Sequence, residues 1–345
     1  MIAMTSKERV MSALRREEPD RVPHFEWLVD WRVRKALCPE CETATDFAVR
    51  MNHDAIIADI TFNKKAIGPG KWESEWGYIT QDTNEEHGIE VEFPIKTMGD
   101  LVQYQPPDVH LPVRYEIISE LIKKYPDKAV IVHLNDVFSL PRYWMGMENL
   151  LMAIIDQPEL VRQLVDLSVN LNLAMAEEVA RRGVKIVYTG DDYAGNLGPM
   201  MSPKHFRDLF FPGLCRVVQG FKSLGLFVIK HTDGNLWPIL DMIVDSGIDC
   251  LDPIDPLAGM DLSRVKAEYG HRIALKGNVD CSNLMTFGTP KQVAEATKIA
   301  LRAGAPNGGF ILSSSNSIHS TVKPENYQAM IDTLEAFGNY PLQIL

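Results

Sequence analysis

Residues 225–233 read Gly-Leu-Phe-Val-Ile-Lys-His-Thr-Asp, an apolar run that turns polar at its end. The unbroken apolar residues at its centre predict a strand buried on both faces, as in a parallel sheet. Side chains alternate between the two faces of a strand, so His231 and Asp233 should point the same way as Phe227 and Ile229. If that face is the interior of a barrel, an imidazole and a carboxylate lie together at its C-terminal mouth.

The same pair also has a plainer explanation. His231 can be a core histidine whose hydrogen bonds are satisfied, and Asp233 can cap a helix that starts near Leu236. The pair alone does not decide between a structural and a chemical role, so the rest of the chain must decide.

Seven further apolar runs alternate with helical patterns. These predicted strands span residues 21–28, 53–60, 129–134, 184–188, 249–251, 272–275 and 310–312. Alternation of strands and helices predicts right-handed crossovers and a parallel sheet. Eight such units are the number that closes a (β/α)8 TIM barrel, so the predicted fold class is α/β. A capped amphipathic helix at about residues 5–16 precedes the barrel.

Residues 61–98 interrupt this alternation. They contain Trp72, Trp76 and Tyr78, many turn formers and two extended pieces. Their apolar content is too low for an independent core. We therefore expect an inserted hairpin over the C-terminal mouth, with residues 1–345 forming a single domain.

The composition indicates a soluble globular protein with an acidic surface. The 345 residues are 46% hydrophobic, and their formal net charge is −11. Because no run of Lys or Arg is long enough to follow phosphates, nucleic acid and acidic membrane surfaces are not expected as partners. Neither a membrane span nor a secretory leader is apparent, which predicts a cytoplasmic location. The oligomeric state is left open, with a homodimer as one option.

Cysteine usage predicts reduced thiols. The chain has five cysteines, an odd number scattered over its length, which suits a cytosolic protein better than a disulfide framework. Cys38 and Cys41 have the spacing of a metal knuckle, but the second pair that would complete a tetrahedral site is missing. We expect Cys215, Cys250 and Cys281 to be small buried or half-buried residues.

Polar side chains follow the C-terminal ends of the predicted strands, the face on which barrel enzymes place their chemistry. They are Glu26, Asp59, Asn135, Asp136, Asp191, Asp192, His231, Asp233, Asp252, Asn278, Asp280 and Asn316. Helix capping explains about half of them. The remaining carboxylates and one strand-end histidine suit either a zinc site with nitrogen and oxygen ligands or a general acid–base set. Spacing alone does not choose between the two.

Several short motifs occur in a fixed order along the chain. They are residues 5–10 with 19–23, Gly190-Asp191-Asp192 with Ser202-Pro203, His231-Thr232-Asp233-Gly234, residues 247–249 with 251–253, Lys276-Gly277-Asn278-Val279-Asp280, and Pro324-Glu325-Asn326. Together they resemble the uroporphyrinogen decarboxylase superfamily over nearly the whole chain. The resemblance implies a single eight-stranded barrel. It also implies one of two activities, a decarboxylase or a cobalamin-dependent methyltransferase.

One departure from the family pattern favours the methyltransferase branch. The resemblance implies that a true decarboxylase carries Arg-Gln-Ala-Gly-Arg after the first strand, where the arginines hold an acidic tetrapyrrole. Residues 26–32 here read Glu-Trp-Leu-Val-Asp-Trp-Arg, which is acidic and aromatic and would repel such a substrate. A decarboxylase acting on a carboxylated substrate is the alternative, and a non-catalytic binding member of the superfamily is the third possibility.

A second departure concerns the metal. The thiol-activating methyltransferases of the family resemble this chain at His231 but have Cys two residues later and another Cys after the last strand as zinc ligands. This chain has Asp233 and the run Ser313 to Asn316 instead. The resemblance therefore implies an oxygen-rich zinc site, for which we predict the ligands His231, Asp233 and Glu26, with Asp191 or Asp192 as further candidates.

The predicted reaction moves a methyl group from a small methylated donor, with methoxylated aromatics included, to a corrinoid. The resemblance implies that a partner protein carries the corrinoid. The metal would stabilise the leaving oxygen. The predicted catalytic residues are His231, Asp233, Asp191 and Asn278. The predicted substrate-binding residues are Glu26, Trp27, Trp31, Asp192, Asn316 and His319. Trp72 and Trp76 can also contact an aromatic ring, although ordinary packing is the plainer explanation for the tryptophans.

Overall fold

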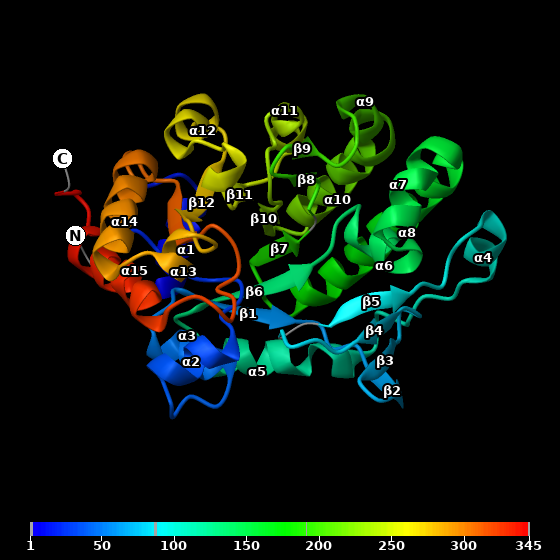
Figure 1. Ribbon diagram of the computed structural model, residues 1–345, viewed down its shortest axis with the longest axis horizontal. Helices are drawn as coiled ribbons and strands as arrows, with labels where there is room; N and C mark the ends of the chain where they lie inside the picture. The colour runs from blue at the N-terminus through cyan, green and yellow to red at the C-terminus, as the bar shows by residue number, and fades with distance from the viewer. Residues whose placement is uncertain (1–2, 86–87, 191, 344–345) are drawn as a thin grey trace.

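Seven parallel strands form one sheet in the parts of the chain that the computed structural model describes, residues 3–85, 88–190 and 192–343. Their order in the sheet is β1, β6, β7, β10, β11, β12 and β13. Their bounds are Ala55–Asp59, Ala129–Leu134, Ile186–Gly190, Phe227–His231, Cys250–Asp252, Ala274–Val279 and Phe310–Ser314. These strands follow one another in the sheet as they do in the chain, which is the strand order of a TIM barrel (Figure 1).

The predicted first strand, residues 21–28, does not form a strand. The segment makes single bridges, including His24 to Leu312 of β13, and the Asp54 N–H just before β1 donates to the His24 carbonyl at 2.7 Å. The segment thus fills the gap between the two edge strands without a regular ladder. Pro23 has no N–H to give, and the Glu26 side chain accepts the Ser314 N–H that a neighbouring strand would use. The expected eight-stranded barrel is corrected to seven strands and one irregular segment.

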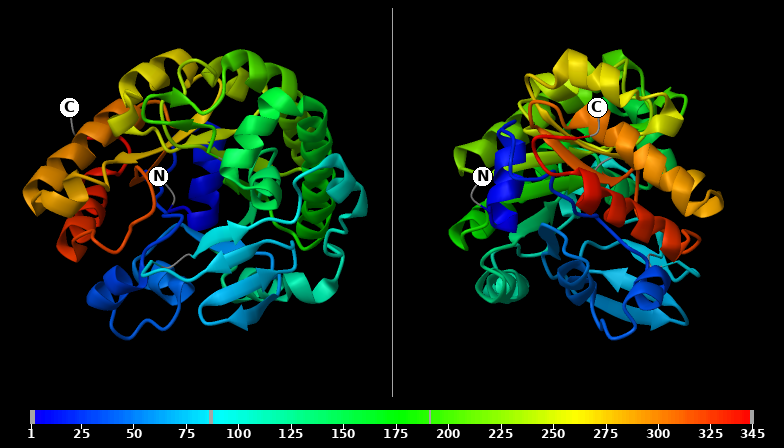
Figure 2. Two further views of the ribbon diagram at one scale, coloured as in Figure 1. Left: turned by 45° about the vertical axis from the view of Figure 1, so that its right-hand side comes forward. Right: turned by 90° about the vertical axis from the view of Figure 1, so that its left-hand side faces the viewer.

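Helices cover the outer face of the sheet, as the arc of ribbons in Figure 2 shows. The longer ones are α5 (Glu116–Lys124), α7 (Met147–Asp156), α8 (Pro158–Arg181), α10 (Phe211–Ser223), α12 (Leu262–Tyr269), α14 (Pro290–Gly304) and α15 (Pro324–Phe337). Shorter helices occur elsewhere in the described chain, namely α2 (Trp31–Leu37), α3 (Ala44–Arg50), α4 (Met98–Gln103), α6 (Ser139–Met145), α9 (Pro203–His205), α11 (Leu240–Asp245) and α13 (Leu284–Phe287). None of the described helices is long and apolar enough to cross a membrane.

The N-terminal helix α1 (Ser6–Leu14) closes one end of the barrel interior. It begins with the predicted capping box, in which Thr5 and Glu8 bond to each other's backbone N–H groups. Its residues Val10 and Leu14 pack in one cluster with inward-facing strand residues such as Ile131. The outward-facing strand residues pack instead with the helices. Because α1 occupies this end of the barrel, the candidate functional site lies at the opposite end, where the strands finish.

The inserted region differs from the predicted hairpin. It forms a four-stranded antiparallel sheet of β2 (Lys64–Gly68), β3 (Lys71–Ser74), β4 (Ile79–Gln81) and β5 (Ile89–Glu92). Aromatic contacts attach it to the barrel, because half-buried Tyr78 stacks on Tyr143 of α6 and buried Trp76 packs near Trp144. The region leaves the barrel directly after β1, beside the C-terminal ends of the strands.

The expectation of reduced thiols is wrong for one pair of cysteines. Cys38 and Cys41 form a disulfide in the loop after α2. Their Cα atoms lie 5.4 Å apart, within the range that a disulfide bridges, because the loop turns back on itself directly after the helix. The other expectation is confirmed, since Cys250 and Cys281 are buried and Cys215 is half-buried.

Candidate metal centre

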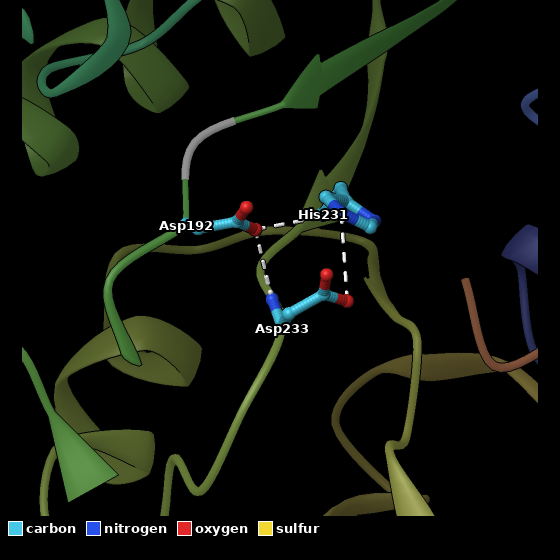
Figure 3. Close-up of side chains that lie close together, drawn as sticks. All are labelled: Asp192, His231 and Asp233. Carbon is cyan, nitrogen blue, oxygen red and sulfur yellow. Dashed lines mark hydrogen bonds and ion pairs between the residues drawn. The ribbon is translucent and has the colours of Figure 1, made fainter. Parts of the chain in front are cut away.

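The ends of two neighbouring strands position the site. In the pairing of β7 with β10, His231 lies opposite Gly190, and the loops that follow these strands run side by side (Figure 3). The Asp233 N–H donates to Asp192 Oδ1 at 3.0 Å, and the Tyr193 N–H donates to the Thr232 hydroxyl at 2.9 Å. These bonds fix both loops and bring the side chains of Asp192 and Asp233 toward the imidazole.

Gly234 allows the second loop to approach the first. Its φ is +89°, a conformation that other residues rarely adopt. A Cβ on this residue would lie 2.6 Å from the carbonyl carbon of Ala194, in the short strand β8 (Ala194–Gly195), which pairs with β9 (Gly198–Pro199). The glycine after His-Thr-Asp is therefore required by close packing of the two loops.

Three side chains form a group with the geometry of metal ligands. His231 Nε2 lies 3.5 Å from Asp192 Oδ1 and 3.6 Å from Asp233 Oδ1. One ligand atom from each residue can be chosen so that all lie within 4.8 Å of one another. Ligands about 2.1 Å from a tetrahedral zinc lie roughly 3.4 Å apart, which is close to these separations. The spacing therefore suits an ion between the three side chains.

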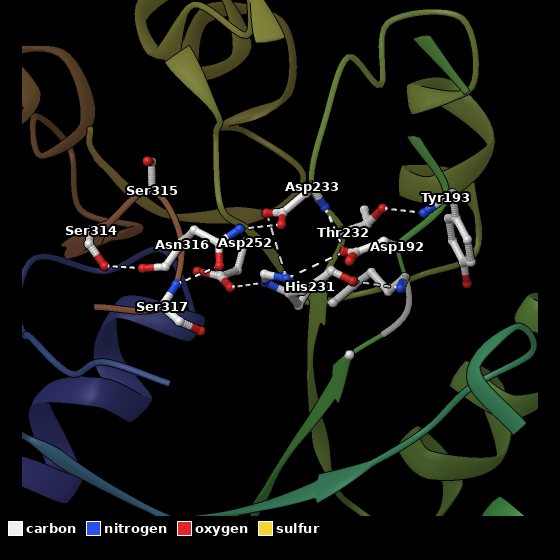
Figure 4. Close-up of polar contacts among 12 residues, drawn as sticks. Asp192, Tyr193, His231, Thr232, Asp233, Asp252, Ser314, Ser315, Asn316 and Ser317 are labelled. Atoms are coloured by element: carbon white, nitrogen blue, oxygen red, sulfur yellow. Dashed lines mark hydrogen bonds and ion pairs between the residues drawn. The ribbon is translucent and has the colours of Figure 1, made fainter. Parts of the chain in front are cut away.

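One oxygen of this group lies near His231 but has no hydrogen bond among the described residues. Asp233 Oδ1 is buried and accepts no hydrogen bond from the described residues. Its other oxygen, Oδ2, accepts a hydrogen bond from the Asn316 amide, which holds the carboxylate in place (Figure 4). A buried carboxylate oxygen without a donor is costly unless a cation binds it. The residues present therefore fit a metal ion, which has His231, Asp233 and Asp192 as candidate ligands.

The opposite nitrogen of His231 is held by a buried hydrogen-bond network. His231 Nδ1 lies 2.7 Å from Asp252 Oδ2 and 3.1 Å from the Tyr188 hydroxyl, which itself donates to Asp252. The ammonium of Lys276 lies 2.6 Å from the other oxygen of Asp252. A carboxylate at Nδ1 places the proton there and leaves Nε2 free to bind a metal. Sequence reasoning assigned no role to Tyr188, Asp252 or Lys276 in this network.

The charges around His231 shift several pKa values. Burial lowers the pKa of His231, but Asp233, Asp252 and Asp192 outweigh it and raise the pKa to about 9. Burial raises the pKa of Asp233 to about 7 against the attraction of His231. Burial also acts to raise the pKa of Asp252, but Lys276 and the hydrogen bond from His231 bring it down to about 2. The group thus concentrates negative charge that a proton or a metal ion can neutralise.

The structure places Glu26 away from the three candidate ligands. Its carboxylate accepts the Ser314 N–H at 2.9 Å and the Ser314 hydroxyl at 2.7 Å. Burial raises its pKa to about 7. Asp192, predicted to bind substrate and also a further candidate ligand, lies with His231 and Asp233 where Glu26 was expected. The reason is topological, because Glu26 lies beside β13 and Asp192 follows the strand next to β10.

The other predicted residues are spread around the mouth. Trp27 stacks on Tyr188 with ring centroids 4.7 Å apart, so it lies beside the network. Asn278 donates to the Ile254 carbonyl at 3.1 Å, and His319 contacts the Thr321 hydroxyl at 3.0 Å. Trp31 is 49% exposed at the start of α2. Asp191 lies outside the described residues.

The two tryptophans of the insertion have different surroundings. Trp72 donates to Asp82 at 3.0 Å in an exposed position, and Lys64 lies over its ring. Trp76 is buried and contacts Phe62, with ring centroids 4.8 Å apart. Packing therefore accounts for Trp76, as the plainer explanation expected.

Comparison with known proteins identifies the family. The family model described as uroporphyrinogen decarboxylase (URO-D) matches residues 78–337. A uroporphyrinogen decarboxylase from Nitrosococcus oceani is 24% identical over 366 aligned positions, which cover 96% of this chain and 97% of that protein. The match to the Psychromonas ingrahamii uroporphyrinogen decarboxylase is 25% identical and covers 52% of this chain but only 49% of that protein.

Methyltransferases are also among the similar proteins. A methylated-thiol–coenzyme M methyltransferase from Methanosarcina mazei is 26% identical over 195 residues, covering 56% of this chain and 51% of that protein. The solved structure of a methyltransferase from the same organism superposes with a TM-score of 0.73 at 19% identity, covering 96% of this chain and 99% of that one. The chain therefore belongs to the uroporphyrinogen decarboxylase family, and its relatives include both decarboxylases and a methyltransferase.

Proposed function

We propose that this chain is a zinc-dependent methyltransferase that moves a methyl group from a small methylated donor to a corrinoid on a partner protein. The observation that carries the proposal is the buried Asp233 Oδ1, which has no hydrogen-bond donor in the described chain and faces His231 and Asp192. The similarity to methyltransferases supports the reaction type. The donor, the corrinoid partner, the cytoplasmic location and a homodimer remain predictions.

The chain's own residues would prepare the site for the donor. A zinc ion held by His231, Asp233 and Asp192 would supply a Lewis acid for the heteroatom that carries the methyl group. Asp252 keeps the proton of His231 on Nδ1, and Asn316 fixes the carboxylate of Asp233. These contacts would hold the ligands in one geometry before the donor arrives, which reduces the reorganisation that the reaction requires.

The pairing of cations at the mouth argues against the decarboxylase alternative. A carboxylated substrate needs basic side chains that are free to bind it. Lys276 is paired with Asp252, Lys230 lies 3.0 Å from Asp136, and Arg32 lies 3.2 Å from Asp30. Arg34 is also engaged in an interaction. Each of these basic groups therefore already has a partner, which leaves methyl transfer as the better-supported reaction.

Metal analysis combined with a transfer assay tests the proposal. Purified protein should contain about one zinc per chain. With a methylated donor it should methylate cob(I)alamin, and the absorbance change of the corrinoid measures this transfer. The His231→Ala variant should lose both zinc and transfer. The exposed His271 provides a matched control, since His271→Ala should keep both. Wild-type protein that transfers methyl groups without bound metal would refute the mechanism.

A further inference from the structure

Three lysines line a pocket at the N-terminal ends of the strands, the end of the barrel opposite the candidate metal centre. The pocket has a volume of about 120 Å3, and Lys7, Lys128 and Lys185 contribute to its lining. Lys7 lies on α1, Lys128 directly precedes β6, and Lys185 directly precedes β7. Three separate segments therefore each supply one cation to this feature, which we call the lysine pocket.

The lysine pocket has no acidic side chain in its lining to balance these cations. The other residues that line it are uncharged. Two acidic residues are neighbours in the sequence, but neither is part of the lining. The carboxylate of Glu8 accepts the Thr5 N–H and hydroxyl in the capping box, and Asp127 is exposed. A group of like charges without counter-charges is unusual in a chain whose net charge is −11, and it repels itself unless an anion binds.

The buried carboxylate that attracts Lys128 is already paired with other cations. Asp54 Oδ1 lies 2.6 Å from an Arg9 nitrogen and 3.0 Å from an Arg21 nitrogen. Arg9 is also paired with Asp20 at 2.6 Å. Two carboxylates thus face three cations, counting Lys128. Burial lowers the pKa of Lys128, and Arg21 and Arg9 lower it further against the attraction of Asp54. The fold therefore leaves a surplus of positive charge beside the pocket.

The ammonium groups of the lysine pocket also have unused hydrogen-bond donors. Lys128 Nζ donates to the His53 carbonyl at 2.5 Å and lies 3.4 Å from the Ser6 hydroxyl. An ammonium has three N–H donors, so one remains after these two contacts. Lys7 and Lys185 make no side-chain hydrogen bond or ion pair with the other described residues. The pocket can therefore offer donors from all three lysines to one ligand.

The charge and the donors together identify the class of ligand. A phosphate group carries about two negative charges at neutral pH and has at least three acceptor oxygens, which matches three ammonium groups. A carboxylate has one charge and two oxygens. Lysine binds phosphate as a point charge and needs no bidentate geometry. Because Lys185 is exposed, the rest of a larger molecule could extend into solvent from a phosphate group in the pocket.

We propose that the lysine pocket is an anion site that binds a phosphate group, either free or carried by a small organic molecule. The site is separate from the proposed methyl transfer, because none of its residues contributes to the candidate metal centre. A bound phosphate would contact α1 and the starts of β6 and β7 at once. Since it would bind only the folded chain, it should also raise the temperature of unfolding.

Isothermal titration calorimetry of the full-length protein at constant ionic strength tests this proposal. The wild type should bind one inorganic phosphate per chain and should bind acetate at least about tenfold more weakly. Lys7→Gln and Lys185→Gln should each weaken phosphate binding roughly tenfold, because each removes one charged donor. Lys291 is exposed on α14 and lies outside the pocket lining, so Lys291→Gln should keep the wild-type affinity. Phenyl phosphate distinguishes the two sources, since tighter binding than inorganic phosphate indicates an organic ligand and weaker binding indicates the free ion.

A metal ion can also bind phosphate, so the titration is repeated with the His231→Ala variant. That variant should bind phosphate as tightly as the wild type, and a loss of binding would place the anion at the metal centre and overturn the proposal. A wild type that binds no phosphate, or an equal loss of affinity in Lys291→Gln, would overturn it as well. Circular dichroism should confirm that each variant is folded. None of these results depends on whether the protein transfers methyl groups, so the two proposals can fail separately.

Discussion

His24 and His231 are both histidines at the barrel wall, yet their neighbours give them opposite charge preferences. His24 has hydrogen-bond partners in the Leu312 carbonyl at 2.9 Å and the Tyr327 hydroxyl at 3.3 Å. Burial lowers its pKa to about 4. His231 instead has three carboxylates nearby, and its pKa rises to about 9. The comparison shows that burial alone does not set the charge preference of a histidine, whereas the carboxylates around it can reverse the effect of burial.

The same contrast holds for the carboxylates on the two sides. Both oxygens of Glu26 accept hydrogen bonds from Ser314, so its polar atoms are satisfied by the fold. Asp233 leaves one buried oxygen without a donor among the described residues. The carboxylate of Glu26 is thus satisfied by hydrogen bonds within the fold, whereas that of Asp233 lies in a cluster of charged side chains.

Removing the cation of Lys276 should have the largest effect on stability. The Lys276→Met substitution leaves the buried carboxylate of Asp252 without its ammonium partner, which should cost about 3–5 kcal/mol of unfolding free energy. Urea unfolding of the metal-free protein measures the loss. Lys222→Met breaks a more exposed pair with Asp249 and should cost less than about 1 kcal/mol. Equal losses in the two variants would contradict the larger cost expected for the buried pair.

Acid should destabilise the other side through His24. Its pKa is about 4 when folded and 6.5 in the ordinary state, so the unfolded chain binds more protons between these values. The unfolding free energy should therefore fall as the pH decreases from 6.5 toward 4, by roughly 3 kcal/mol from this residue. Urea unfolding at several pH values should show a shallower slope in His24→Asn. The exposed control His271→Asn should keep the wild-type slope, and a wild-type slope in His24→Asn would show that His24 is not the cause.

The sequence allowed much of the fold to be predicted because the signals were local. Apolar runs located all seven strands of the described sheet close to their observed positions, and the strand periodicity brought His231 and Asp233 together. The irregular segment was missed because its cause is a side-chain contact between Glu26 and Ser314, which are far apart in the sequence.

The rest of the site depends on which side chains meet at the ends of neighbouring strands, and the predicted order of the strands alone does not reveal that. Asp192 faces His231 because β7 pairs with β10, and Asp252 reaches it because β11 lies on the other side. One signal was available at Lys276, a lysine that directly follows the apolar run at residues 272–275. A lysine buried in a strand needs a carboxylate partner, so an acidic residue at a neighbouring strand end was to be expected.

The phenol of Tyr188 should affect metal binding without being a ligand. In Tyr188→Phe, Asp252 loses one hydrogen-bond donor and orients His231 less firmly. Zinc affinity should fall roughly tenfold, as is typical when the partner of a metal-bound histidine is weakened. Competition with a chromophoric chelator measures the change. Tyr327→Phe is a matched control, because its hydroxyl contacts His24 and His53 instead, and zinc affinity there should equal that of the wild type.

The smallest effect is expected for Glu26, and it sharpens the comparison between the two carboxylates. Glu26→Gln keeps one acceptor oxygen for Ser314, so the unfolding free energy should fall by only about 1 kcal/mol and the zinc content should stay near that of the wild type. Asp233→Asn replaces one carboxylate oxygen by an amide, removes the negative charge and should lose most of the zinc. Metal analysis of both variants tests which carboxylate binds zinc. A loss of zinc in Glu26→Gln would show that Glu26 is a ligand, as predicted from the sequence.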